Sequence, residues 1–223
     1  CDKTLFLVFR GEHYWTTVVF FLFAANWIAG AKAVQLALWF WAGFSKLNHH
    51  FPAVVCVMTS NSPFTRSDWL RRLLYRHYPD DLRPSPLAAR MGHAGTALEM
   101  LVPLVLVFAP PGWPLYLGMA LMLFLHIYIT SNVPMGVPIE WNFMVVYGAF
   151  ALFWAHPDVS VLDLGSIPLS IFLVVMLILI PLAGNFFPRL ISFLLAMRYY
   201  AGNWACSVWL FRGESYRKLE KLT

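Results

Sequence analysis

Apolar runs separated by short polar or proline-rich breaks dominate the pattern of the chain. A membrane-spanning helix needs about 20 predominantly apolar residues, and six runs meet or approach that length. The predicted spans are residues 14–29, 33–47, 94–109, 113–130, 141–155 and 167–183. The pattern therefore predicts an all-α fold, a polytopic transmembrane helix bundle of about six spans.

The breaks between the runs carry residues that end helices. Pro110-Pro111-Gly112 separates the third run from the fourth, and the segment 131–138 contains two further prolines. Proline lacks the backbone N–H that a continuing helix needs. Gly30 with Lys32 is the expected turn between the first two spans, although this signal is weaker.

The longest connection, residues 48–92, is rich in arginine. Within it, residues 67–76 place apolar side chains at helical spacing, with Ser67 or Asp68 as a possible cap. This pattern predicts a basic interfacial helix on an anionic leaflet, with Trp69 and Tyr75 near the headgroups. The alternative is a solvated helix packed on the protein itself.

Beyond the sixth span, residues 184–223 form a C-terminal segment that contains an amphipathic stretch at 190–211. This stretch is expected to lie on the membrane or against the bundle rather than to cross it. The chain begins with Cys1 and not with Met. We therefore expect 1–223 to be a single transmembrane domain, part of a longer chain.

Composition agrees with a membrane protein. Hydrophobic residues make up 60% of the chain and charged residues only 12%, whereas about 25% are charged in a typical soluble domain. The formal net charge is +5, and the basic residues gather at both ends and in the 48–92 loop. The positive-inside rule then predicts a multi-pass protein of the cell membrane with these three parts in the cytoplasm.

The remaining composition excludes several classes. No basic stripe alternates with exposed aromatics, so nucleic acid is not an expected partner. The three cysteines include no CxxC spacing, which argues against a zinc ribbon or a disulfide framework. The histidines lack the repeated HxxxH and HxxHH boxes of di-iron desaturases, so no metal site is predicted. The expected partners are membrane lipids and other membrane-protein subunits.

Two ionisable residues within or at the end of predicted spans are candidates for chemistry, because charge inside a bilayer is costly. Glu99 lies in the middle of the third span, where it would suit a proton carrier or a general acid; a structural carboxylate paired with a Lys, a His or a Trp N–H is the equal alternative. Lys46 ends the second span. It either anchors the helix at the interface or, drawn into a dry pocket, serves as a base; its position favours the anchor.

Further polar residues are expected at the same membrane side as Lys46. His126 ends the fourth span and is the third candidate catalytic residue after Lys46 and Glu99. The candidate ligand-binding residues are His49, His50, His93, Trp39 and Asn142, with Glu140 close to the last of these in sequence. Such clustering is consistent with a polar pocket, although interfaces collect polar residues in any case.

Two segments resemble a known family. Ala42-Gly43-Phe44-Ser45-Lys46-Leu47, and His126 followed by Met135-Gly136-Val137-Pro138, resemble the transmembrane region of the vitamin K-dependent gamma-carboxylases and the related horizontally transferred transmembrane domain family. The resemblance covers roughly residues 14–155. It implies that Lys46 corresponds to the base that deprotonates a hydroquinone and that His126 corresponds to a similarly placed histidine. This chain lacks the lumenal substrate-binding domain, so peptide glutamate carboxylation is not expected.

The whole chain is more similar to an uncharacterised family of large actinobacterial, notably mycobacterial, membrane proteins. The segments that carry this likeness are 45–52, 58–63 and 197–204. That family implies no activity. Its members are longer than this chain, which agrees with the absence of an initial methionine.

Three functions remain open at this stage. The first is a membrane protein that holds a quinone or lipid in an intramembrane pocket, with Lys46 as base and Glu99 or His126 assisting proton transfer. The second is a non-catalytic scaffold or anchoring subunit of a larger cell-envelope or respiratory complex. The third is a lipid or small-solute transport component. Quinone is the only cofactor candidate, and enzymatic activity is an open question.

Overall fold

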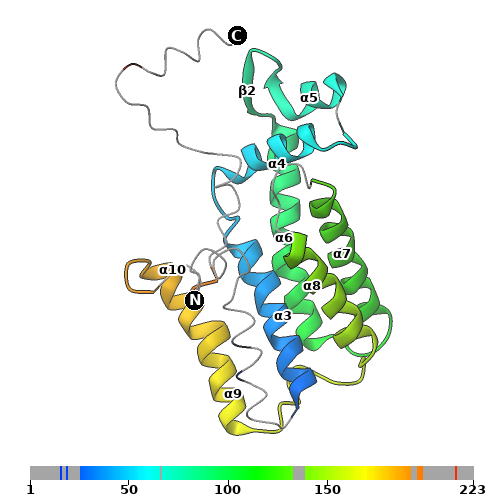
Figure 1. Cartoon of the computed structure of the whole chain (residues 1–223), viewed down its shortest axis with the longest axis vertical. Coiled ribbons are helices and arrows are strands. Elements are labelled where there is room, and N and C mark those ends of the chain that lie inside the picture. The colour runs from blue at the N-terminus through cyan, green and yellow to red at the C-terminus, as the bar shows by residue number, and fades with distance from the viewer. Residues whose placement is uncertain are drawn as a thin grey trace.

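Long helices lie side by side and form the body of the protein, as Figure 1 shows. The computed structural model describes residues 16, 19, 26–65, 67–132, 139–191, 195–197 and 214. The long helices of this part are α3 (Trp27–Phe44), α6 (Pro86–Phe108), α7 (Trp113–Thr130), α8 (Ile139–Gly148) with the π-helix η3 (Ala149–Trp154), and α9 (Ile167–Val174) with η4 (Val175–Leu179) and α10 (Ile180–Phe186).

Three helices within the described residues are long and apolar enough to cross a membrane. They are Pro86–Phe108, Trp113–Thr130 and Ile167–Phe186, and they match the third, fourth and sixth predicted spans. The fifth coincides with a shorter apolar helix, Trp141–Trp154. Most of the first predicted span and of the 190–211 stretch lies outside the described residues, so the count of six spans stays a prediction.

The turn expected at Gly30 and Lys32 is wrong, because both residues lie inside α3. The helix begins at Trp27, and the Asn26 side chain caps it by accepting a hydrogen bond from the Ala29 N–H at 3.4 Å. Gly30 is one of the buried residues of this helix. The helix ends at Phe44, which places Lys46 in the turn that follows it.

The 48–92 connection is folded rather than an open loop, and it caps one end of the bundle (Figure 1). It contains α4 (Phe51–Asn61), α5 (Asp68–Leu74) and an antiparallel hairpin of β1 (Tyr75–His77) and β2 (Asp81–Pro84). The hairpin is a difference from the all-α prediction. The sequence does not reveal it, because strands of three and four residues are too short to show an alternating pattern of apolar and polar positions.

Helix α6, which corresponds to the third predicted span, begins earlier than expected, at Pro86 and not near Ala94. Ser85 caps it, because its hydroxyl accepts a hydrogen bond from the Ala88 N–H at 3.2 Å. Proline is suited to the first helical position that follows. The helix also continues through Pro103, which lies on its buried face.

A small core holds the capping region together. Cys56, Leu74, Tyr75 and Ala88 are buried against one another, and burial raises the pKa of the Cys56 thiol to about 11, which keeps it neutral. The expectation that Tyr75 lies near lipid headgroups is wrong, because its hydroxyl pairs with Ser60 at 3.0 Å in this core. Trp69, in contrast, is 71% exposed on α5. The short helix is therefore packed on the protein by one face and leaves an aromatic on the other.

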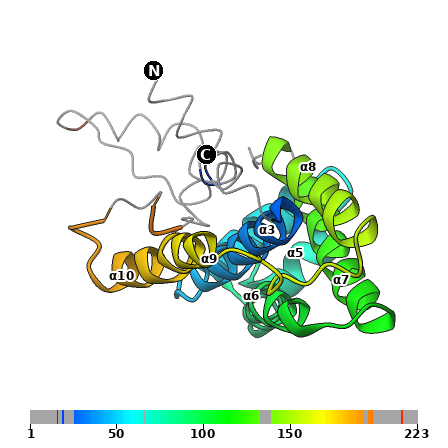
Figure 2. The ribbon, with the colours of Figure 1, turned by 90° about the horizontal axis from the view of Figure 1, so that it is seen from below.

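Helix α3 is the centre of the bundle. Seen from below in Figure 2, it lies between α9, α6 and α8, and its most extensive contacts are with α6. Most of its residues are buried, among them charged Lys32 and polar Gln35. A helix that is buried nearly all round is typical of the interior of a bundle. Polar groups on α3 must therefore find partners inside the protein.

Candidate functional site

A buried ion pair joins α6 to the turn that follows α3. The Lys46 ammonium donates hydrogen bonds to both carboxylate oxygens of Glu99. The Glu99 side chain is 4% exposed and that of Lys46 is 14% exposed. The Phe51 ring, at the start of α4, has its centroid 5.5 Å from Lys46 Nζ, within the range of a cation–π contact. The pair is thus shielded from solvent and closed on one side by an aromatic ring.

Gly43 lets the two helices approach closely enough for this pair to form. A Cβ atom at Gly43 would lie 2.8 Å from the Glu99 Cβ and 2.8 Å from the Met100 Cγ. One turn before Glu99, the Thr96 hydroxyl is buried and has no hydrogen-bond partner within the described residues. A buried polar atom of this kind is uncommon in native proteins. The crossing of α3 and α6 therefore combines an ion pair with an unused hydrogen-bonding group.

A second polar group lies deeper in the bundle, where three helices meet. Trp39 Nε1 on α3 donates to His126 Nε2 on α7 at 2.7 Å, and His126 Nδ1 lies 2.8 Å from Asn142 Oδ1 on α8. All three residues are at most 2% exposed. Since the indole N–H can only donate, Nε2 accepts and Nδ1 carries the hydrogen that Asn142 accepts. The hydrogen bonds thus define a neutral imidazole with one tautomer.

The two polar groups are both attached to α3. Lys46 lies in the turn that follows this helix, and Trp39 of α3 donates to His126. The structure thus brings together Lys46 with Glu99, and Trp39 with His126 and Asn142. The interpretation of Lys46 as a simple interfacial anchor is wrong, because its ammonium is paired inside the protein.

Three predicted ligand-binding residues do not join this site. His49, His50 and His93 are exposed, and none of them has a hydrogen bond to the buried pair or to the His126 group within the described part of the chain. Their shared position near one end of the bundle reflects the polar character of that end. The side chain of Glu140 lies outside the described residues.

Sequence reasoning missed two buried polar residues on α3. Gln35 Nε2 donates to the Val145 carbonyl of α8 at 2.9 Å, and Lys32 Nζ donates to the carbonyls of His156 and Val159 at 2.7 and 2.6 Å. A signal was present, because positions 32, 35 and 39 follow the three- and four-residue spacing of one helix face. The polar face of α3 is therefore turned toward the protein, and not toward lipid.

The hydrogen bond from Trp39 to His126 can be tested by a substitution that keeps the ring. Trp39→Phe preserves an aromatic that stacks near Phe153 but leaves Nε2 of His126 without its donor. We expect a loss of about 1–3 kcal/mol in the free energy of unfolding, because a buried acceptor is left unsatisfied. Thermal unfolding in detergent measures this. Trp113→Phe, at a 76% exposed position on α7, is the control, and an equal loss there would contradict the assignment.

The helices and the buried ionisable groups define a polytopic α-helical membrane protein with a polar interior. The chain belongs to DUF3556, a family described as transmembrane proteins of unknown function, and the match covers residues 1–223. Neither the curated proteins nor the solved structures contain a match to this chain.

The family match confirms the coarse part of the sequence interpretation. The chain is a transmembrane protein and belongs to an uncharacterised family. The actinobacterial origin, the likeness to the carboxylase-type domain and the cytoplasmic placement of the termini stay predictions. Within the described residues, no group of three or more His, Cys, Asp or Glu side chains is arranged to hold a metal ion.

Proposed function

We propose that this transmembrane protein holds a quinone or another lipid beside the Lys46–Glu99 pair and exchanges a proton with it. The observation that carries the proposal is the pair itself, which places an ammonium and a carboxylate in a shielded site between helices. Ionisable groups within a membrane are costly and generally mark functional sites. Acid–base chemistry on a lipophilic molecule requires such groups within the reach of the bilayer.

The proton transfer can be written with this chain's own residues. Transfer of a proton from Lys46 Nζ to a Glu99 oxygen leaves a neutral amine and a carboxylic acid. The amine then accepts the proton of a ligand hydroxyl, that of the hydroquinone form where the ligand is a quinone. This restores the ammonium and leaves a ligand oxyanion beside it. Glu99 retains the first proton and can later return it to a ligand oxygen. The charge of Lys46 stabilises the oxyanion at the point where it forms.

Two neighbouring groups support a ligand at this position. The Thr96 hydroxyl has an open hydrogen-bonding capacity one turn from Glu99, so it could accept from, or donate to, a ligand oxygen. The neutral imidazole of His126 is held rigidly by Trp39 and Asn142, which suits it to orient a neighbouring group rather than to carry charge. We assign His126 an assisting role in the transfer.

The test is the identification of what purifies with the protein. Native mass spectrometry and lipid extraction of the detergent-purified wild type are expected to show one quinone or lipid per chain. The double variant Lys46→Met/Glu99→Gln leaves no unpaired charge and should reduce this ligand roughly tenfold or more, since a charge-assisted hydrogen bond contributes about 1.5–3 kcal/mol. Arg90→Met, at an exposed position on α6, is the control with unchanged ligand.

A non-catalytic membrane scaffold is the second candidate, and one observation favours it. Lys46 and Glu99 already satisfy each other, and both ring nitrogens of His126 already have partners. Groups satisfied in this way can serve as clamps between helices. A folded protein that purifies with other polypeptides and without any stoichiometric small molecule would replace the ligand-binding proposal by this one.

A further inference from the structure

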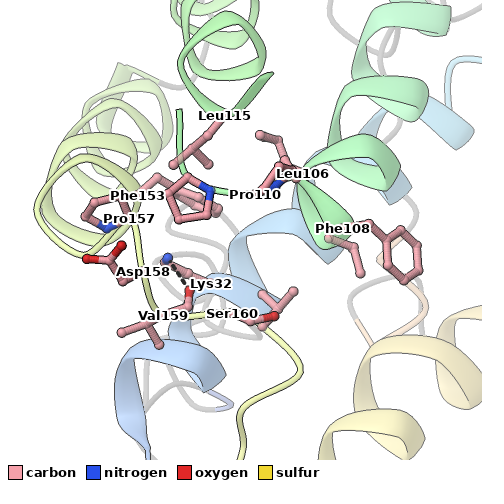
Figure 3. A pocket seen from close by; sticks show the side chains of 14 residues that line it. Lys32, Leu106, Phe108, Pro110, Leu115, Phe153, Pro157, Asp158, Val159 and Ser160 are labelled. Carbon is pink, nitrogen blue, oxygen red and sulfur yellow. Dashed lines mark hydrogen bonds between the residues drawn. The ribbon is translucent and has the colours of Figure 1, made fainter. Parts of the chain in front are cut away.

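A cleft lies where α6 ends and α7 begins, at the end of the bundle away from the 48–92 segment (Figure 1). Figure 3 shows the side chains that line it. Its volume is about 190 Å³. It is formed by the end of α6, the start of α7, the end of η3 and the connection that follows η3. Its lining includes Lys32, Leu106, Phe108, Leu115, Phe153 and Asp158.

The cleft is separate from the Lys46–Glu99 pair. Lys32 and Lys46 are 14 positions apart, and a helix rises about 1.5 Å per residue, so they lie roughly 20 Å apart along the axis. The cleft and the ion pair are therefore two separate places along the bundle. Neither Lys46 nor Glu99 lines the cleft.

Lys32 is the charged group at the centre of the cleft. The residue is 2% exposed, and its ammonium donates to two carbonyls and lies 5.1 Å from the centroid of the Phe153 ring. An ammonium has three N–H donors, so one remains after these two bonds. Asp158 lines the same cleft, but within the described residues no ion pair joins Lys32 to a carboxylate. In this part of the chain the buried ammonium therefore has no anion in contact with it.

The walls of the cleft are largely apolar, which suits a ligand that has an apolar chain attached to its charged group. Leu106, Leu115 and Phe153 are apolar, and Phe108 is 76% exposed at the rim, on the surface of a helix that is long enough to cross a membrane. Pockets for whole drug-sized ligands measure about 300–1,000 Å³. The smaller volume here fits a headgroup, while the apolar rim lets an attached chain continue along the lipid-facing surface.

We propose that this cleft binds the anionic headgroup of an acyl lipid, with its carboxylate or phosphate oxygen on the Lys32 ammonium and its chain leaving past Phe108. Asp158 is the competing negative charge at the same site. It keeps the cation balanced when the cleft is empty and weakens the binding of an anion. The site is independent of the quinone or lipid proposed at Lys46.

Photo-crosslinking tests this site with defined probes. Purified protein receives diazirine-bearing palmitic acid at a mildly alkaline pH, where the carboxyl group is ionised, and the matched neutral probe is diazirine-bearing hexadecanol. We expect the acid to label peptides that contain 106–111 or 153–161, and the alcohol to label them roughly tenfold less. A second arm compares diazirine-bearing phosphatidylglycerol with diazirine-bearing phosphatidylcholine. Stronger labelling by palmitic acid identifies the headgroup as a carboxylate, and stronger labelling by phosphatidylglycerol identifies it as a lipid phosphate.

Two substitutions separate binding from structural support. Lys32→Gln keeps a donor for the two carbonyls but removes the charge, and should reduce labelling by the anionic probes to the level of the neutral ones. Asp158→Asn removes the competing charge and should increase labelling by the anionic probes above the wild-type level. Lys32→Arg keeps the positive charge and should retain most of the wild-type labelling. Equal labelling by the acid and the alcohol would overturn the proposal. Labelling that stays unchanged in both single variants, Asp158→Asn and Lys32→Gln, would also overturn it. If Lys32→Gln fails to fold, the result for Asp158→Asn decides alone.

Discussion

Glu99→Gln alone is expected to lower the free energy of unfolding by about 3 kcal/mol or more, and adding Lys46→Met should recover most of that loss. Removal of one partner from a buried ion pair leaves an uncompensated charge and costs about 3–5 kcal/mol, whereas replacement of both partners is often close to neutral. The 14% exposure of the Lys46 side chain gives its ammonium some access to water, which places the expected loss at the lower end of that range.

The measurement is a double-mutant cycle on thermal or denaturant unfolding in one detergent. Two residues in direct contact should show a large coupling energy, while independent sites would show additive losses. The exposed pair of Asp81 and Arg83, joined at 2.7 Å, is the matched control. Arg83 holds the pKa of the Asp81 carboxyl well below its usual range, yet water screens the pair, so Asp81→Asn should change stability little. Additive losses at Lys46 and Glu99 would contradict the buried pair.

Gly43→Ala is expected to destabilise the bundle by about 1–3 kcal/mol, although alanine is the better helix former. The added methyl group would lie 2.8 Å from the Glu99 Cβ. An atom so close to the backbone of α6 cannot rotate away, so the two helices must separate. Separation would also loosen the ion pair and reduce ligand retention.

Gly95→Ala is the matched control for this prediction. Gly95 lies on the facing helix α6, but nothing stands within 4 Å of a Cβ added there. Without a clash, the helix propensity of alanine should make this variant equal to the wild type or up to about 1 kcal/mol more stable. Unfolding of both variants in the same detergent measures the difference. A Gly43→Ala protein as stable as Gly95→Ala would show that the helices do not cross closely at Gly43.

The residues of the candidate site were predictable as individuals and not as contacts. Glu99 and His126 were singled out because charged or polar groups within apolar runs are rare. That Lys46 pairs with Glu99 depends on a contact across 53 positions, which no local period reports. His49, His50 and His93 were grouped with them by position along the chain, but their side chains are exposed, because the end of a helix has an outer face as well as an inner one.

Lys32 is a residue whose local sequence predicts an exposed turn, whereas the structure places it inside a helix and buried. In sequence, a glycine followed two positions later by a lysine is typical of a polar turn between spans. In the structure, the carbonyls of His156 and Val159 accept two hydrogen bonds from the ammonium, and the helix runs through this position without interruption. The cost of burying the charge is offset by the hydrogen bonds that Lys32 donates to a segment more than a hundred residues away.

The sequence by itself determined the class of protein and the approximate position of most helices. Burial of apolar runs in a bilayer and the helix-breaking effect of proline are local properties, and they are readable from runs of about 20 residues. Only the tertiary structure decided which polar side chains meet, where α3 begins and how the 48–92 segment folds. Those outcomes depend on packing between distant segments, such as the close approach at Gly43, and packing energy is a property of pairs of surfaces and not of a single stretch of chain.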